Sequence, residues 1–187
     1  MKFTPTALPG VVIVDPDVHG DSRGFFLETW HAERYRQAGI DADFVQDNLS
    51  RSSRHTLRGL HAQVRRPQGK LVRVVEGSVF DVAVDIRRGS PHYGRWVGCE
   101  LSAADQRQMY VPPGFAHGFC VLTEFAQFEY KCTDFYDPDD QIAIRWNDPE
   151  IGVEWPVDAP TLSPRDQSAP LLRDFGPGQL PEFEPGR

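Results

Sequence analysis

Cysteine is scarce in this chain, and the few cysteines present argue against a disulfide framework. Cys99, Cys120 and Cys132 are an odd number, and no two of them have the C-x-x-C spacing of a zinc knuckle. A chain of 187 residues is long enough to bury a sizeable core without a disulfide or a structural metal. We therefore expect a single domain over residues 1–187.

Long hydrophobic runs are also missing. The longest uninterrupted apolar stretches, such as residues 11–14, fall far short of the roughly 18 residues that a membrane helix needs. The first residues, Met-Lys-Phe-Thr-Pro-Thr, contain no apolar core of a signal peptide. We expect a cytoplasmic protein that makes no membrane contact.

Positive charge is in the minority, and no dinucleotide fingerprint is present. The chain has 20 Lys and Arg against 27 Asp and Glu, which gives a formal net charge of −7. Because duplex binding needs a positive surface, a nucleic-acid partner is not expected. No G-x-G-x-x-G segment occurs, so a nicotinamide cofactor is not expected either.

What the sequence does contain is alternation of period two. Along residues 80–86 the even-numbered side chains are all apolar, whereas Asp81, Ala83 and Asp85 share the other face. Only residues 31–38, which end at Gly39, have a convincing helical pattern. The other expected strands are 11–14, 24–30, 70–75, 94–101, 107–111, 118–123 and 126–133. Many short strands predict an all-β sandwich, jelly roll or barrel, with an irregular C-terminal segment after Pro156 that has one short helix.

Charge is unevenly distributed along the chain. Residues 48–75 contain seven Arg and Lys but no Asp or Glu, whereas residues 134–154 contain seven acidic residues and one arginine. A basic block in an acidic protein indicates a local site for an anion such as a diphosphate. The alternative is a solvated edge strand that is protected by charge. We favour the solvated edge for Arg65 and Arg66, and a functional role for Arg58 within Leu-Arg-Gly-Leu-His.

One candidate base is His61. If residues 57–63 form a strand, Gly59, His61 and Gln63 point the same way, and the glycine leaves room for a ligand near the backbone. Histidine is the natural general base near neutral pH, although a lone histidine is more often structural.

A second histidine, His117, follows a Pro-Pro-Gly turn that is expected to deliver it to the start of the next strand. The pattern is similar to the P-x-G-x-x-H half of the cupin signature. Metal-binding cupins also use His-x-His and a carboxylate, where this chain has Gln63 and Gln68. Only His61 and His117 remain from such a ligand set, so we do not expect a metal.

Tyr130 and Asp166 are further candidates. Tyr130 shares a strand face with Phe128 and Cys132, so it is either a core residue or a proton donor that enters a pocket. Asp166 stands near a helix start, where it most simply caps the helix, and it is also a candidate partner to orient a histidine.

Seven short motifs follow one another along nearly the whole chain. They are residues 21–28 (DSRGFFLE), 46–50 (QDNLS), 57–61 (LRGLH), 70–73 (KLVR), 80–87 (FDVAVDIR), 112–119 (PPGFAHGF) and 146–149 (WNDP). Each motif is weak alone, but the ordered set resembles the dTDP-4-dehydrorhamnose 3,5-epimerase family of metal-independent cupins. The resemblance implies a jelly roll of two antiparallel sheets with a few short helices, and a homodimer in which an N-terminal strand is shared between subunits. It also implies an isomerase of dTDP-L-rhamnose biosynthesis that epimerises dTDP-4-dehydro-6-deoxy-D-glucose at C3 and C5 without a cofactor.

The resemblance further implies roles for individual residues. His61 would remove the proton next to the C4 ketone, Asp166 would orient His61, and Tyr130 would deliver a proton from the opposite face. Lys70 would stabilise the enolate at the ketone oxygen. Gln141 stands where many relatives carry a glutamate, and its amide can still hydrogen-bond a ligand. The implied substrate-binding residues are Arg23, Glu28, Gln46, Asn48, Arg58, Lys70, His117, Tyr136, Gln141 and Arg165.

Three other functions remain open. An epimerase that acts at C5 or C3 only would use the same residues, so the sequence separates it poorly from the first choice. A non-catalytic cupin that binds nucleotide sugars is disfavoured because the four catalytic candidates are all present. A metal-dependent cupin oxygenase is disfavoured by Gln63.

Overall fold

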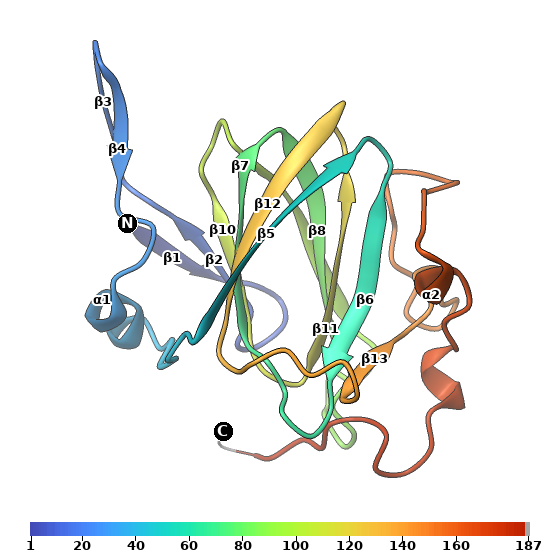
Figure 1. The fold of residues 1–187 in the computed structure, drawn as a ribbon. Helices are drawn as coiled ribbons and strands as arrows, with labels where there is room; N and C mark the ends of the chain where they lie inside the picture. Colours follow the sequence, from blue (N-terminus) through green and yellow to red (C-terminus); the bar gives the residue numbers. More distant parts are fainter. Residues whose placement is uncertain (186–187) are drawn as a thin grey trace.

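Antiparallel strands make up nearly all of the regular structure in residues 1–185, the part of the chain that the computed structural model describes (Figure 1). The last two residues of the expected domain lie outside that part. The elements in chain order are β1 (Lys2–Pro5), β2 (Val12–Asp15), β3 (Val18–Asp21), β4 (Gly24–Leu27), α1 (Ala32–Gln37), β5 (Gln46–Ser53), β6 (Leu57–Gln63), β7 (Lys70–Glu76), β8 (Ser78–Asp85), β9 (Trp96–Ser102), β10 (Gln108–Val111), β11 (Phe115–Val121), β12 (Phe125–Cys132), β13 (Gln141–Ala143), α2 (Pro164–Gln167) and the 3-10 turn η1 (Leu172–Asp174).

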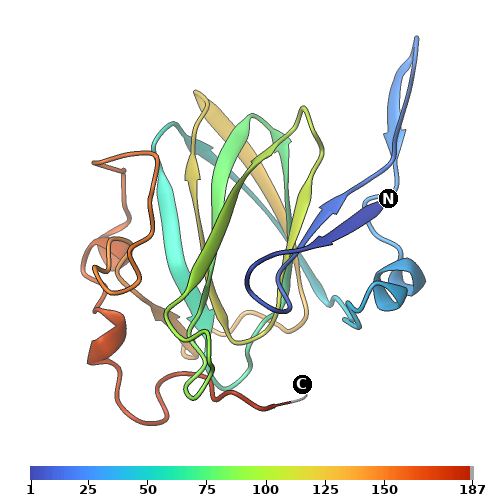
Figure 2. The same cartoon turned by 180° about the vertical axis from the view of Figure 1, so that it is seen from behind.

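Two sheets face each other and form the body of the molecule (Figure 2). One has six strands in the order β1-β2-β10-β7-β12-β5, and the other has five in the order β13-β6-β11-β8-β9. A separate hairpin of β3 and β4 projects away from both sheets. The expected all-β, jelly-roll class is confirmed.

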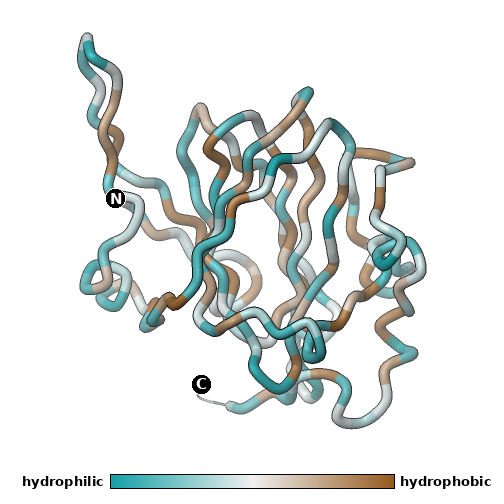
Figure 3. Tube along the Cα trace, viewed as in Figure 1, coloured by the Kyte–Doolittle hydropathy of each residue, from teal (hydrophilic) through white to brown (hydrophobic). Residues whose placement is uncertain are grey.

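The sheet interior and the outer face of the five-stranded sheet are both buried. The alternation along β8 explains why: Ala83 belongs to the core between the sheets, whereas Val82 and Val84 face outward. There they pack against Ile144, which follows β13, and against the C-terminal segment, which contributes Leu172 and Leu180. Figure 3 shows the corresponding alternation of hydrophobic and hydrophilic positions along the strands. The C-terminal segment therefore completes a second hydrophobic core.

Most expected strands occur, with shifts at their ends. The strand expected over 24–30 ends at Leu27, and the expected helix covers Ala32–Gln37 before Gly39, whose φ of +88° suits glycine. β11 starts earlier than expected, so His117 lies inside the strand and not at its start. The C-terminal segment has two short helical turns, α2 and η1, where one was expected. The strands that pattern did not predict are β1, β3, β5 and β13.

The basic and acidic blocks of the sequence partly neutralise each other. Arg65 Nε lies 3.1 Å from Asp140 Oδ1, and Arg66 forms an ion pair with Asp134. Both arginines are exposed, in keeping with the surface position favoured for them. These two charges are therefore already compensated within the chain.

Two further features of residues 1–185 bear on the sequence-based expectations. Cys99, Cys120 and Cys132 are all free thiols. No helix within the described residues is long and apolar enough to span a membrane.

Candidate active site

A histidine and an aspartate that are far apart in the sequence meet beside β6. His61 Nε2 lies 2.6 Å from Asp166 Oδ1, so the two form a hydrogen-bonded dyad. Ser163 caps α2, and its hydroxyl accepts a 3.1 Å hydrogen bond from the Asp166 backbone N–H. Pro164 at the first helical position favours the helix start at this point. The short helix thus fixes the carboxylate against the strand.

The surroundings of Asp166 favour its charged form. Burial raises the pKa of the Asp166 carboxyl, but the hydrogen bond and charge of His61 and the backbone N–H of Gly59 outweigh burial, so that the pKa lies below its usual value. A carboxylate that accepts a hydrogen bond from Nε2 leaves Nδ1 of His61 as the basic nitrogen. Nδ1 forms no hydrogen bond to any described residue. The dyad is therefore built to take up one proton.

A cavity of about 330 Å³ opens next to the dyad. Its lining combines His61 and Asp166 with side chains from β6, β13 and the C-terminal segment. The full lining is Thr56, Leu57, Arg58, His61, Gln141, Thr161, Leu162, Ser163, Arg165 and Asp166. The volume falls in the range typical of small-molecule sites.

Two arginines at this cavity have no carboxylate partner among residues 1–185. Arg58 Nε donates to Ser52 Oγ at 3.0 Å, and Arg165 Nη1 donates to Gln141 Oε1 at 2.7 Å. Gln141 Oε1 also accepts a hydrogen bond from the Tyr136 hydroxyl at 3.1 Å. Two uncompensated guanidinium groups at one cavity suit a dianionic group such as a diphosphate.

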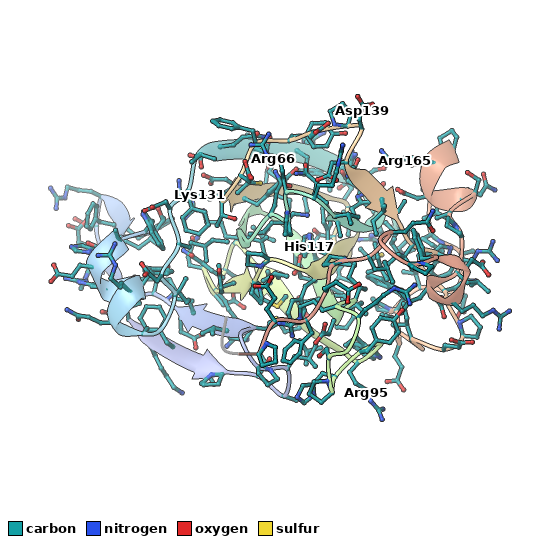
Figure 4. The ribbon with its side chains drawn as sticks, turned by 90° about the horizontal axis from the view of Figure 1, so that it is seen from below. Arg66, Arg95, His117, Lys131, Asp139 and Arg165 are labelled. Carbon is teal, nitrogen blue, oxygen red and sulfur yellow. The ribbon has the colours of Figure 1, made fainter. Side chains whose placement is uncertain are left out.

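A second histidine–aspartate pair lies between the sheets. His117 Nε2 is 2.9 Å and 3.1 Å from the two carboxylate oxygens of Asp81, and both side chains are buried. Figure 4 places His117 near the middle of the molecule, and Arg165 lies toward the side of the C-terminal segment. His61 and His117 are direct partners in the pairing of β6 with β11, so the two histidines are neighbours on one sheet.

Lys70 faces the same interior from the opposite sheet. It pairs with Cys132 of β12, in the row of alternate residues that includes Val72 of the inner core. Burial lowers the pKa of the Lys70 ammonium, while Cys132 and then Asp81 act in the opposite direction. Within the described chain the Lys70 side chain makes no hydrogen bond or ion pair. Its ammonium is therefore available to a ligand oxygen.

Tyr130, Asn48 and Gln46 lie on the interior side of the six-stranded sheet. Tyr130 is paired with Asn48 across β12 and β5, and it packs against the inner core. Gln46 Nε2 donates to Asn48 Oδ1 at 3.0 Å, and Gln46 Oε1 accepts from the Tyr136 backbone N–H at 2.9 Å. Burial raises the pKa of the Tyr130 hydroxyl, so the group keeps its proton at neutral pH. Tyr130 is thus a neutral hydrogen-bond and proton donor.

Two of the expected binding residues are not brought to the cavity by this chain. Arg23 lies on the projecting hairpin, where it is exposed and pairs with Asp21 (Figure 1). Glu28 lies beyond β4 and is 3.0 Å from Arg34 of α1. Tyr136 is exposed in the loop between β12 and β13, where its hydroxyl contacts Gln141 of the cavity lining. The other sequence-based candidates lie at the cavity or on strand faces that point between the sheets.

The two glutamines that replace cupin metal ligands hold loops. Gln63 Nε2 donates to the backbone oxygens of Arg66 and Phe135, and Gln68 Nε2 donates to that of Asp134. In residues 1–185 no three His, Cys, Asp or Glu side chains lie together as a metal-ligand set.

Asp81 is the one buried acid at this site to which the sequence analysis assigned no role. The only sequence feature that could have pointed to Asp81 was the presence of an acidic residue on the less apolar face of the strand over residues 80–86. Asp85 gives the same signal, and its carboxylate serves Arg87 and Ser90 at 2.7 Å and 2.6 Å. The sequence pattern therefore does not separate the two acids.

Known proteins that resemble the chain point in one direction. The matching family model is described as dTDP-4-dehydrorhamnose 3,5-epimerase, and it covers residues 5–174. The curated dTDP-4-dehydrorhamnose 3,5-epimerase of Pseudomonas aeruginosa is 54% identical over 176 residues, which are 93% of this chain and 97% of that protein. The dTDP-4-dehydrorhamnose 3-epimerase of Streptomyces niveus is 40% identical over 186 residues, 98% of this chain and 90% of that protein. The crystal structure of the dTDP-6-deoxy-D-glucose-3,5-epimerase of Legionella pneumophila with dTDP-4-keto-L-rhamnose has a TM-score of 0.95 and 48% identity, and it covers 98% of both chains.

Proposed function

Since the chain belongs to the dTDP-4-dehydrorhamnose 3,5-epimerase family and is thus an isomerase, we propose that the dyad of His61 and Asp166 is its base. The substrate is dTDP-4-dehydro-6-deoxy-D-glucose, and the product is dTDP-4-dehydro-L-rhamnose. The observation that carries the proposal is the 2.6 Å contact of the dyad at a cavity with two unpaired arginines.

The proton transfers follow from the groups that face the reacting carbon. Nδ1 of His61 takes the proton next to the ketone, and the C–H electron pair moves into the enolate. The Lys70 ammonium lowers the cost of the negative charge on the enolate oxygen. Tyr130 returns a proton from the other face, and its phenolate regains one from solvent while His61 releases its own. Inversion needs two groups, because a single base would restore the original configuration.

The remaining candidates bind the non-reacting parts of the substrate. Arg58 and Arg165 suit the diphosphate because neither is neutralised by a carboxylate within the described residues. The polar groups that suit the sugar and the nucleoside are Gln46, Asn48, His117, Tyr136 and Gln141.

Incubation with the 4-keto-6-deoxy sugar nucleotide in D2O, followed by NMR, tests the function. Deuterium at both C3 and C5, together with the inverted product, is the expected result. Deuterium at one position would favour a single-position epimerase, a candidate that the name of the Streptomyces niveus relative supports. Deuterium at neither position would favour a binding protein.

Treatment with EDTA is expected to leave the activity unchanged. His61 and His117 each use Nε2 for a hydrogen bond to an aspartate, and Gln63 and Gln68 bond to the backbone of loops. The residues at the cupin ligand positions are thus engaged within the chain, and the proposed proton transfers do not require a Lewis acid. The measurement is the epimerisation rate before and after dialysis against EDTA, with metal analysis of the protein. A stoichiometric transition metal whose removal stops turnover would contradict this expectation.

The projecting hairpin supports a homodimer in which each chain completes the site of the other. Phe25 and Phe26 on β4 are 62% and 72% exposed, which is unfavourable for aromatic side chains in water. Arg23 lies in the turn of the same hairpin and is not among the residues that line the cavity of its own chain. Docking of the hairpin on a partner would bury both rings and bring Arg23 to the partner's cavity.

Co-expression of Arg23→Ala and His61→Asn chains is expected to restore activity that neither variant has alone. Random pairing makes about half of the dimers mixed, each with one intact site, so about a quarter of the wild-type rate is expected. Light scattering at micromolar concentration should give the mass of a dimer. A monomer, or no rescue by mixing, would contradict a shared site.

A cytoplasmic location is also proposed. The three cysteines are free in the described structure, which fits a reducing compartment. Recovery of the protein with the membrane or secreted fraction would contradict this location.

A further inference from the structure

The two arginines of the cavity are held in different ways. Each terminal nitrogen of Arg165 already donates to Gln141, one to the side-chain oxygen and the other to the backbone oxygen. Arg58 uses only its inner nitrogen, Nε, which donates to Ser52 Oγ at 3.0 Å. Within residues 1–185 neither terminal nitrogen of Arg58 makes a hydrogen bond. Arg58 can therefore offer both terminal nitrogens to one phosphate group, in the bidentate arrangement that guanidinium groups favour.

Ser52, the residue that holds Arg58, comes from the opposite sheet and is buried there. It lies on β5, is 7% exposed, and is paired with Ala126 of β12, which belongs to the core between the sheets. Residues that are paired directly across two strands share a face of the sheet, so Ser52 faces the same interior. In the described part of the chain its hydroxyl bonds to Arg58 and to no other group. The buried oxygen thus has a single partner.

A bulge in β6 directs Arg58 to the same side of the strand as the base. His117 of β11 is paired with His61, whereas Phe119, two residues further on, is paired with Arg58. Two steps along β11 therefore match three steps along β6, and an extra residue of this kind changes the direction of the side chains beside it. Phe119 packs in the core between the sheets, so Arg58 lies on that face, where it lines the cavity together with His61.

The hydrogen bond to Arg58 matters because a side chain that is free to move must be ordered when an anion binds. Immobilising one long side chain costs binding free energy and lowers affinity several-fold. A serine hydroxyl that already holds Nε removes much of that cost before the ligand arrives. It also fixes the plane of the whole guanidinium group, because Nε and the two terminal nitrogens are coplanar.

We propose that Ser52 is a positioning residue for the substrate: it holds Nε of Arg58 so that both terminal nitrogens point into the cavity and bind one phosphate of the diphosphate in a bidentate contact. The proposal rests on the proposed function, which assigns the diphosphate to Arg58. It deepens that assignment by naming the group that orients the arginine and the form of the contact.

Calorimetric titration of the full chain with inorganic pyrophosphate, at constant ionic strength, measures this contact. Ser52→Ala removes the hydroxyl and should raise the dissociation constant of pyrophosphate by about 3–10-fold, the cost of ordering one long side chain. In the epimerisation assay KM should rise by a similar factor while kcat changes little, because the diphosphate does not react. Ser52→Thr keeps a hydroxyl and should restore the wild-type dissociation constant.

Ser53→Ala is the matched control. Ser53 is the next residue of β5, and its exposed hydroxyl lies 3.3 Å from that of Thr56. This variant loses the same oxygen atom and should bind pyrophosphate as the wild type does. A double variant tests whether Ser52 acts through the arginine. In Arg58→Ala the further change Ser52→Ala should have no additional effect on affinity, since the partner is already gone.

The proposal fails if Ser52→Ala binds pyrophosphate as tightly as the wild type, or if Ser53→Ala loses as much affinity. It also fails if the double variant binds more weakly than Arg58→Ala, or if the wild type does not bind pyrophosphate. Weaker binding by Ser52→Ala, combined with a wild-type protein that does not epimerise the sugar nucleotide, would support the role of Ser52 and count against the proposed function.

A measurement on the wild type decides the matter even if Ser52→Ala does not fold. The Nε–H signal of Arg58 is identified in NMR of labelled arginine side chains by its absence from Arg58→Lys. It should exchange with water more slowly than the Nε–H of Arg95, whose exposed side chain makes no hydrogen bond within residues 1–185. Equal exchange rates would show that Ser52 does not hold the arginine.

Discussion

His61→Asn is expected to lower epimerisation by about 10²–10⁴-fold or more, the range found when a general base is removed. Deuterium exchange should disappear at both C3 and C5, because both abstractions depend on the one dyad. Asparagine is polar and smaller than histidine, so it fits in β6 and the strand and its partner β11 should persist. The Asp166 carboxylate loses its imidazole donor, which adds to the loss.

The control for this variant is His55→Asn. His55 is exposed and has a φ of 64°, a backbone conformation that asparagine tolerates well. Its rate should equal that of the wild type. Exchange that survives at C3 but not C5 in His61→Asn, or the reverse, would show that the two positions use different bases.

Tyr130→Phe is expected to separate exchange from inversion. The ring and its packing against Phe128, with centroids 5.9 Å apart, remain in the variant, but the proton donor is lost. Abstraction by His61 should continue, so deuterium still enters the substrate, while net inversion falls more steeply than exchange, toward the same 10²–10⁴-fold range. Parallel measurement of both rates by NMR in D2O gives the ratio directly.

Tyr93→Phe is the matched control, because Tyr93 is 38% exposed on another part of the surface. Equal loss of exchange and inversion in Tyr130→Phe would mean that the hydroxyl orients the sugar or the base. Loss of neither would mean that water or another group donates the proton.

The fold was the easier part to predict from sequence, because alternation is a local property. The pattern over residues 80–86 predicts a strand with two different faces, and β8 has them. The turn before β11 shows the limit: Pro-Pro-Gly predicts a break but not its length, so His117 was placed at the strand start instead of inside it. Strands such as β5 were not predicted because nearly all of their residues are polar, so no apolar face alternates with a polar one.

The site could not be assembled from local pattern at all. His61 and Asp166 are 105 residues apart, and their contact depends on where a four-residue helix docks. By residue type alone, each was a weak candidate for a catalytic role, and only the family resemblance of the ordered motifs predicted that the two act together. Arg65 and Arg66 lie in the basic block but not in the site, because acidic residues far along the chain form ion pairs with them. The role of Asp81 could not be predicted because the sequence of its own strand does not show which residue of a neighbouring strand it contacts.

The segment that covers the outer face of the five-stranded sheet also carries Asp166. A ribosome that has made residues 1–150 has already made His61, Lys70 and Tyr130, but the base still lacks its carboxylate. The partial chain would also leave Val82 and Val84, on the outside of β8, without the cover of Leu172 and Leu180. Completion of the hydrophobic cover and assembly of the dyad are therefore the same docking event. A nascent or truncated chain is consequently inert toward its sugar nucleotide until its final segment has folded back onto the sheet.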